Sequence, residues 1–248
     1  MSALFSAVFG TPIAATVFVI EFISIGIMHY SALVPCLTAS AVAHFVAIQF
    51  GAEAEVYTIV ETTAFAPIAC VKVLILGVAC AVVGICFCFL LHKVSKLLKQ
   101  YGYNDYVRIL GGGTLIMCLT VLTGCYDYNG SGTAVIEQAI AGKAVWYAFL
   151  LKMIFTAITL GSGYKGGEIV PSFYIGSTMG CVVGPLLGLP ASLSAAMGLI
   201  GVFCAVVNCP MASIIMSIEL FGSENLPFFA IICAVSYMLS GPFSLYSS

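Results

Sequence analysis

The chain alternates apolar stretches with short breaks made of glycine, proline or charged residues, and this pattern predicts eight or nine helices. The expected helical segments are residues 11–30, 31–50, 67–98, 110–122, 145–160, 169–188, 192–207, 211–221 and 227–239. Segment 67–98 is longer than the ~20 residues that a bilayer requires, so we expect it to tilt or to extend beyond the membrane. Several others are too short to cross ~30 Å of hydrocarbon alone.

Short segments interrupted by glycine or proline imply helix ends buried at membrane depth. Such ends expose unpaired N–H and C=O groups, which hydrocarbon does not tolerate unless they line a polar cavity. The pattern is therefore typical of a transporter or channel.

Composition supports a membrane protein. Of the 248 residues, 62% are hydrophobic and 7% are charged, which excludes a water-soluble globule. We predict an all-α, multi-pass integral membrane protein. A net charge of −2 and a single Trp give no support for a nucleic-acid partner. No enzyme motif or metal-ligand spacing is found, and we expect no cofactor and no metal. The cysteines are interpreted as small packing residues.

Charge is concentrated in two connections. Residues 52–61 contain three glutamates and are expected to form a polar loop. Half of the eight basic residues lie at or just after the end of the apolar segment 67–98, namely Lys93, Lys96, Lys99 and Arg108. By the positive-inside rule this connection is cytoplasmic.

An internal repeat relates residues 1–22 to residues 199–220. Pro12 matches Pro210 and Glu21 matches Glu219, and in each copy the Glu follows the Pro by nine residues. Weak symmetry of this kind is typical of two-repeat transporters. We predict one transmembrane domain over residues 1–248, with 1–50 ending a first repeat and 67–248 forming a second. On this alignment the first repeat would begin about 130 residues before Met1, so the chain is interpreted as an N-terminally truncated fragment.

A glycine-rich loop, residues 161–168, runs into an apolar helix that contains Pro171. Glycines let successive N–H groups turn toward one point, and the helix N-terminus adds its positive dipole end. This arrangement predicts an anion site without a fixed cation. The alternative from the residues alone is an ordinary helix start, with Glu168 as a favourable first-turn acid.

The same motif resembles a known family. Gly167-Glu168-Ile169-Val170-Pro171 is similar to the Gly-x-Phe-x-Pro element of the CLC chloride channels and anion/proton antiporters. The resemblance extends over residues 9–14 and 20–21, over 208–212, and to Tyr246, at the position of the family's central tyrosine.

The resemblance implies an inverted-repeat homodimer in the bacterial plasma membrane that moves chloride or fluoride, with or without protons. It implies anion binding by Gly167, Glu168, Ile169, Val170 and Tyr246. The family's dimer contact is built from helices that match residues 11–30, 31–50, 211–221 and 227–239.

Three departures from the family pattern matter. The elements that match the gating glutamate would lie upstream of Met1. Phe22 stands where chloride/proton antiporters have an internal glutamate, and Ile169 replaces the aromatic residue of the motif. Glu168 resembles the fluoride/proton antiporter branch and is the candidate for proton coupling.

Two other functions remain open at this stage: transport of another small anion, and a fragment that keeps the fold without transporting. Glu21 and Glu219 are expected either to act in transport or to cap helices. Lys152 is expected to reach toward the membrane surface with its ammonium group.

Overall fold

The computed structural model describes residues 1–23, 29–52, 56–101 and 104–241, and within them the chain is helical and contains no strand. The first group of helices is α1 (Ser2–Phe9), α2 (Pro12–Ile23), the 3-10 turn η1 (Tyr30–Ala32) and α3 (Leu33–Gln49). The second group is α4 (Pro67–Tyr101), α5 (Asp105–Thr123), α6 (Thr133–Ile140), α7 (Ala148–Gly161), α8 (Ile169–Leu186), α9 (Ala191–Val207), α10 (Pro210–Phe221) and α11 (Leu226–Ser240).

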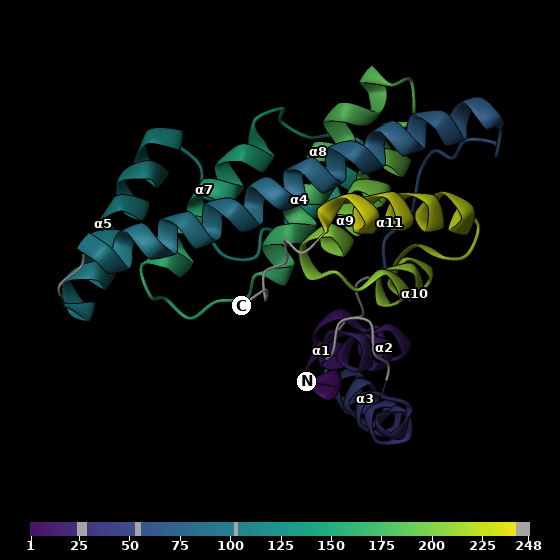
Figure 1. Cartoon of the computed structure of the whole chain (residues 1–248), viewed down its shortest axis with the longest axis horizontal. Coiled ribbons are helices and arrows are strands. Elements are labelled where there is room, and N and C mark those ends of the chain that lie inside the picture. The colour runs from purple at the N-terminus through teal and green to yellow at the C-terminus, as the bar shows by residue number, and fades with distance from the viewer. Residues whose placement is uncertain (24–28, 53–55, 102–103, 242–248) are drawn as a thin grey trace.

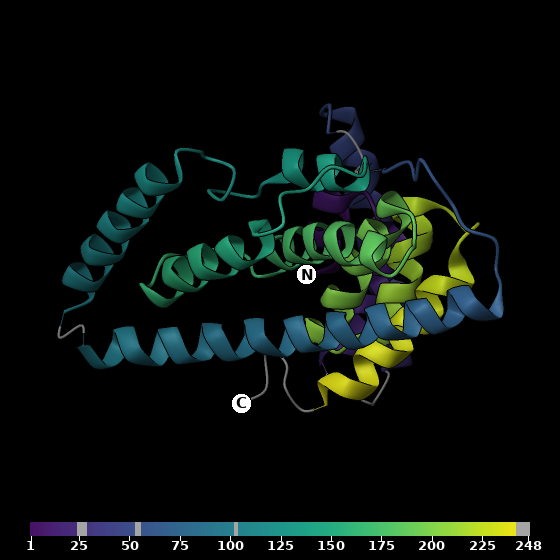
Figure 2. The ribbon, with the colours of Figure 1, turned by 90° about the horizontal axis from the view of Figure 1, so that it is seen from above.

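Helices α1–α3 lie to one side of the second group, as Figure 1 shows, and α2 packs against α10. The 35-residue helix α4 runs along the second group and packs on α7, α9 and α11. Figure 2 shows α5 beside the C-terminal end of α4, at an angle to α4 and apart from the other helices. Its closest packing partner in the described part is α7.

Most predicted segments correspond to observed helices, and three details differ. Helix α5 begins at Asp105 and not at residue 110, so its 19 residues are long enough to span a membrane. Helix α6 was not predicted, because its eight residues directly follow a turn-rich loop. Helix α2 is described to Ile23 only, and residues 24–28 of the segment expected to reach residue 30 lie outside the described part.

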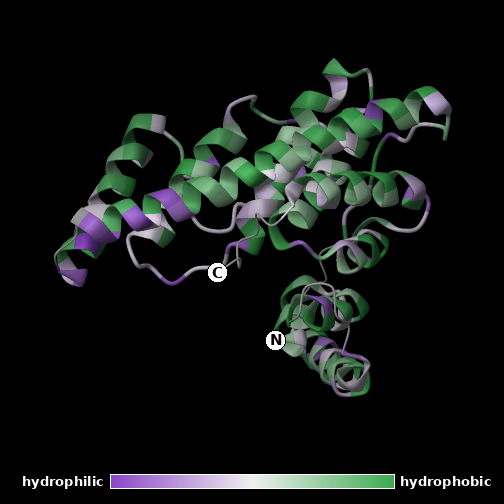
Figure 3. Cartoon of the chain, viewed as in Figure 1, coloured by the Kyte–Doolittle hydropathy of each residue, from purple (hydrophilic) through white to green (hydrophobic). Residues whose placement is uncertain are grey.

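Length and composition identify four helices among the described residues that could cross a membrane. These are residues Tyr30–Gln49, Pro67–Gln100, Asp105–Thr123 and Ile169–Leu186. Five further apolar helices have 10–17 residues and are too short to cross ~30 Å of hydrocarbon alone. Hydrophilic residues gather where α4 meets α5, as the purple colour in Figure 3 shows, and this is the basic connection for which the positive-inside rule predicts a cytoplasmic location.

Helices α8 and α9 form the centre of the fold and approach each other at their backbones. All residues of α9 from Ser192 to Val207 are buried. A Cβ atom added at Gly176 or Gly180 would collide with backbone atoms of Gly198 and Ser194, respectively. Small residues are thus required at this crossing, as is common in membrane helix pairs.

The two segments of the internal repeat have matching helices and matching turns between them. Helix α1 ends at Gly10 (φ 71°) and α9 ends at Asn208 (φ 59°), so both linkers use the left-handed conformation. The N–H of Gly10 donates to the Ser6 carbonyl and that of Asn208 to the Cys204 carbonyl, each at 2.9 Å. A proline then begins the next helix in both copies.

The two copies are joined by a reciprocal pair of carboxylates. Glu219, in the last turn of α10, accepts hydrogen bonds from the N–H groups of Ile13 (3.0 Å) and Ala14 (2.8 Å) at the start of α2. Glu21, in the last turn of α2, accepts from Met211 (3.2 Å) and Ala212 (2.9 Å) at the start of α10. Each C-terminus therefore meets the other's N-terminus, so α2 and α10 are antiparallel, as an inverted repeat requires.

This exchange satisfies N–H groups that have no partner within their own helix, and it places each negative charge on a positive dipole end. Of the two roles left open for Glu21 and Glu219, the structure shows the capping role.

We expect Glu21→Ala and Glu219→Ala to destabilise the protein by a similar amount, about 2 kcal/mol each, because each removes both charge-assisted hydrogen bonds of one cap. Thermal unfolding in detergent measures the loss. Glu137→Ala, at an exposed position of α6, is the control. A loss at one of the two positions only would show that the caps are not equivalent.

We expect Gly180→Ala to lower the unfolding temperature strongly, because its new methyl group meets the backbone at Ser194 and overpacking costs ~1–3 kcal/mol or more. The control is Gly111→Ala in α5, where no atom lies within 4 Å of the added Cβ. Alanine there should be neutral or slightly stabilising, since it favours the helix. Equal effects of the two substitutions would contradict the backbone contact.

Candidate functional site

The predicted anion element forms the start of α8. Glu168 is the N-cap residue of this helix and is half-buried, while Gly166 and Gly167 before it are exposed. The first-turn N–H groups of Ile169 and Val170 have no acceptor within an α-helix, and Pro171 contributes no N–H. The N–H groups of Ile169 and Val170 thus point out of the helix start, next to its positive dipole end.

Three cavities meet at this helix start. One of about 430 Å³ lies toward α1 and α2 and contacts residues 166–170. A second of about 600 Å³ lies toward α5 and α7 and contacts Gly166, Gly167, Val170 and Pro171. A third of about 190 Å³ lies toward α4 and contacts Glu168. No atom lies within 4 Å of a Cβ placed on Gly167, so the backbone here is accessible to a small ligand.

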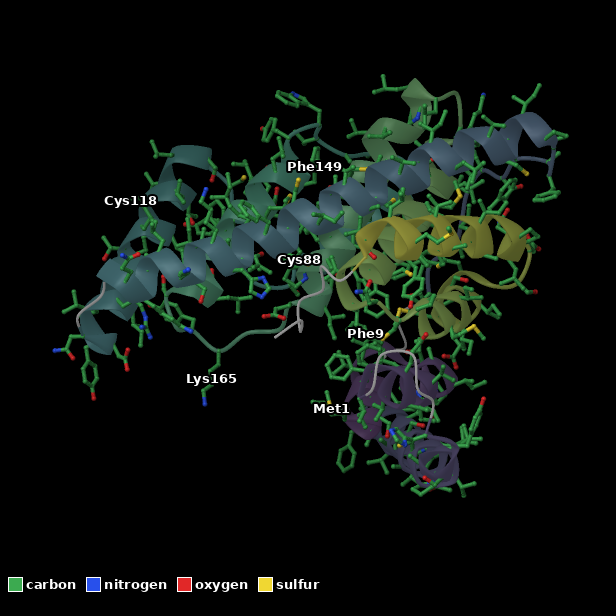
Figure 4. The ribbon with its side chains drawn as sticks, in the orientation of Figure 1. Met1, Phe9, Cys88, Cys118, Phe149 and Lys165 are labelled. Carbon is green, nitrogen blue, oxygen red and sulfur yellow. The ribbon has the colours of Figure 1, made fainter. Side chains whose placement is uncertain are left out.

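The cavity toward α1 and α2 has an aromatic wall. Phe5, Phe9 and Phe18 line it, with the rings of Phe5 and Phe18 4.9 Å apart. Phe9 lies at the edge of the α1–α3 group in Figure 4 and packs edge-on against Phe173 of α8, at 5.3 Å between ring centroids. Aromatic ring edges carry partial positive charge, so such a wall tolerates a small anion better than an aliphatic wall does.

The prediction that the Lys152 ammonium group reaches toward the membrane surface is wrong. The Lys152 side chain is 1% exposed and does not reach the membrane surface. Its Nζ donates to the carbonyls of Gly130 (2.7 Å) and Tyr128 (3.2 Å) and lies 4.8 Å from the centre of the Tyr174 ring. The polar loop that precedes α6 folds over α7 and supplies these acceptors, which is why burial of the ammonium group is tolerated.

The glycine-rich loop itself brings no cation to the start of α8. Lys165 is exposed, and in Figure 4 it extends away from the rest of the molecule. Lys152 lines the 600 Å³ cavity, but its ammonium group is engaged by two carbonyls. Among the described residues, the start of α8 thus presents backbone N–H groups and the Glu168 carboxylate, and the anion site itself stays a prediction.

The structure brings Gly167, Glu168, Ile169 and Val170 together as one element. Tyr246 lies outside the described residues, so its approach to this element stays a prediction. Sequence reasoning did not identify His92, which lines the 190 Å³ cavity together with Glu168. In the part of the chain that the structure describes, no group of three His, Cys, Asp or Glu side chains could hold a metal ion.

Comparison with known proteins agrees with this architecture. The chloride/fluoride channel protein of Pseudomonas syringae pv. tomato is 36% identical over 252 residues, covering 99% of this chain and 56% of the relative. The H(+)/Cl(−) exchange transporter ClcA of Yersinia pestis is 27% identical over 62% of this chain and 35% of its own length. The chain thus spans about half the length of the Pseudomonas syringae relative.

Among solved structures, a CLC-type fluoride/proton antiporter superimposes with a TM-score of 0.95 at 36% identity, over 99% of this chain and 62% of that one. A slow cyanobacterial Cl−/H+ antiporter shares the fold, with a TM-score of 0.76 at 18% identity over 95% of this chain and 58% of that one. The family model of the voltage gated chloride channels matches residues 1–241. The chain therefore belongs to the voltage-gated chloride channel (CLC) family.

Proposed function

We propose that this chain forms the anion-binding part of a CLC protein that moves halide across the bacterial plasma membrane in exchange for protons. One observation carries the proposal: the start of α8 exposes backbone N–H groups and Glu168 where three cavities meet. Donors of this kind bind a halide without the strong attraction of a fixed cation, so that the ion can leave again.

Fluoride is the halide that we favour. The 36% identical relatives are described as a chloride/fluoride channel protein and a fluoride/proton antiporter. Fluoride is small and strongly hydrated, so it requires close N–H donors, and the open backbone at Gly167 permits a close approach. Chloride, or another small anion, remains the alternative that the flux measurement below decides.

Glu168 is the group that we assign to proton coupling. A carboxylate at an anion-binding helix start repels an arriving halide, and protonation removes that repulsion. Anion binding and protonation of Glu168 therefore favour each other. A low-dielectric surrounding strengthens this mutual effect, and Glu168 is half-buried beside apolar walls.

A homodimer in the lipid bilayer is the expected assembly. Apolar side chains on α2, α3, α10 and α11 are exposed, and in α3 the single buried residue is Ser40. In water such a surface would aggregate, whereas lipid or a second subunit covers it without cost. The exposed residues include Ile13, Phe45, Val46, Met211, Ile218 and Met238.

The first prediction from this proposal concerns the transported ion. The chain, alone and joined to the part of the Pseudomonas syringae relative that it does not match, is reconstituted in liposomes. An imposed fluoride gradient should drive proton movement through the joined protein, and chloride should drive less. Equal proton movement with an organic anion would favour the alternative transporter. If no anion passes through the joined protein, the proposal is wrong and the chain keeps the fold without transporting.

The second prediction concerns Glu168. In the joined protein, Glu168→Gln should abolish fluoride-driven proton movement, because an amide cannot take up the proton, while uncoupled fluoride flux remains. Glu137→Gln, an exposed acid on α6, is the matched control and should keep the proton-to-fluoride ratio. An unchanged ratio in the Glu168→Gln variant would return Glu168 to the role of a helix-start acid.

A further inference from the structure

Glu168 shares its smallest cavity with a histidine. The cavity of about 190 Å³ is lined by Leu91, His92 and Ser95 of α4, by Leu160 and Gly161 at the end of α7, and by Glu168. Its volume is that of several water molecules, since each occupies about 30 Å³ in the liquid. Two of its walls, His92 and Glu168, can gain and lose a proton.

The orientation of the His92 ring is fixed by its own helix. Its Nδ1 lies 2.7 Å from the carbonyl oxygen of Cys88, one turn earlier in α4. A carbonyl only accepts, so Nδ1 carries the proton of this hydrogen bond. In the neutral ring Nε2 is then the nitrogen with a lone pair, and it is the atom that can take up and release a proton.

The same turn of α4 faces Glu168. The Cys88 side chain is 3% exposed, and it lies close enough to Glu168 to be affected by its charge. Cys88 thus contacts the His92 ring with its carbonyl and approaches Glu168 with its thiol. His92 itself is exposed, so its ring lies between the cavity and the surface of α4.

The charges around His92 indicate on which side of the membrane this end of α4 lies. Lys93, Lys96 and Lys99 follow it on α4, and Arg108 of α5 donates through Nε to the Ser162 carbonyl at the end of α7. These are the basic residues that place this end of α4 in the cytoplasm. The buried thiol of Cys88 is a further titratable group of α4 near Glu168.

We propose, on the basis of the proposed function above, that His92 is the proton-transfer residue between cytoplasmic water and Glu168. A proton from the cytoplasm binds Nε2 and gives the imidazolium ion. Nε2–H then releases that proton through cavity water to the Glu168 carboxylate, which becomes the neutral acid, and the ring returns to its neutral form. Nδ1–H stays on the Cys88 carbonyl throughout. This route serves a chain that has Phe22 at the position of the internal glutamate of its family.

The transport test uses the joined protein in liposomes. His92→Ala should slow fluoride-driven proton movement ~10-fold or more, which is a lower bound on the ~10²–10⁴-fold that a positioned proton-transfer group contributes. Millimolar imidazole on the cytoplasmic side should restore it, which a merely structural histidine would not allow. His44→Ala, on α3, is the matched control and should change neither the rate nor the imidazole response. An unchanged rate and pH profile in His92→Ala would overturn the proposal.

A second test works on this chain without transport. After a rapid drop in pH, infrared spectroscopy follows the carboxylic acid band that Glu168→Gln abolishes. We expect His92→Ala to slow the appearance of this band ~10-fold or more, and imidazole to restore the rate. Equal rates in wild type and His92→Ala would overturn the relay even if fluoride transport is found. A slowed band in a chain that carries no halide would support the relay and contradict the proposed function alone.

Discussion

The exchange of carboxylates between α2 and α10 is the constraint on which the arrangement of the two repeats depends. Each helix has a proline at its start and a glutamate near its end, and neither can satisfy its own first N–H groups. In hydrocarbon no water would supply the missing acceptors. The two helices satisfy each other only when they lie antiparallel and in one register. This pairing fixes the α1–α3 group against the second repeat, and it brings the aromatic residues of α1 and α2 over the start of α8.

The mechanism that we propose separates two electrostatic tasks. In it, backbone dipoles bind the halide because they attract without a full charge, and Glu168 and His92 exchange the proton. The buried cation nearby, Lys152, is held by carbonyl groups of the loop before α6 and stabilises that loop over α7. A lysine free to face the cavity would bind the anion more tightly and slow its release.

Most helices of the fold and part of the candidate site could be predicted from the sequence. Hydropathy predicted the long α4 and the short helices, because these depend on local composition. The matching Pro and Glu positions indicated the repeat. The caps between the repeats depend on contacts between residues 190 and 206 positions apart in the sequence, so both roles of the glutamates stayed open. The glycine-rich loop identified residues 167–170 through backbone chemistry alone. His92 escaped notice because a single histidine in an apolar run has no local signature, and its relation to Glu168 exists only when α4 packs against the end of α7.

The glycine contact between α8 and α9 has a mechanical consequence. Because Gly176 and Gly180 place backbone directly on backbone at Gly198 and Ser194, no side chain lies between the two helices that could change rotamer and absorb displacement. The two helices can shift very little relative to each other, so they behave as one rigid body. The first turn of α8, at the end of this rigid pair, keeps its N–H groups in a constant relative geometry. Within this chain, displacement near the start of α8 is therefore left to the glycine-rich loop before it and to the aromatic side chains of α1 and α2.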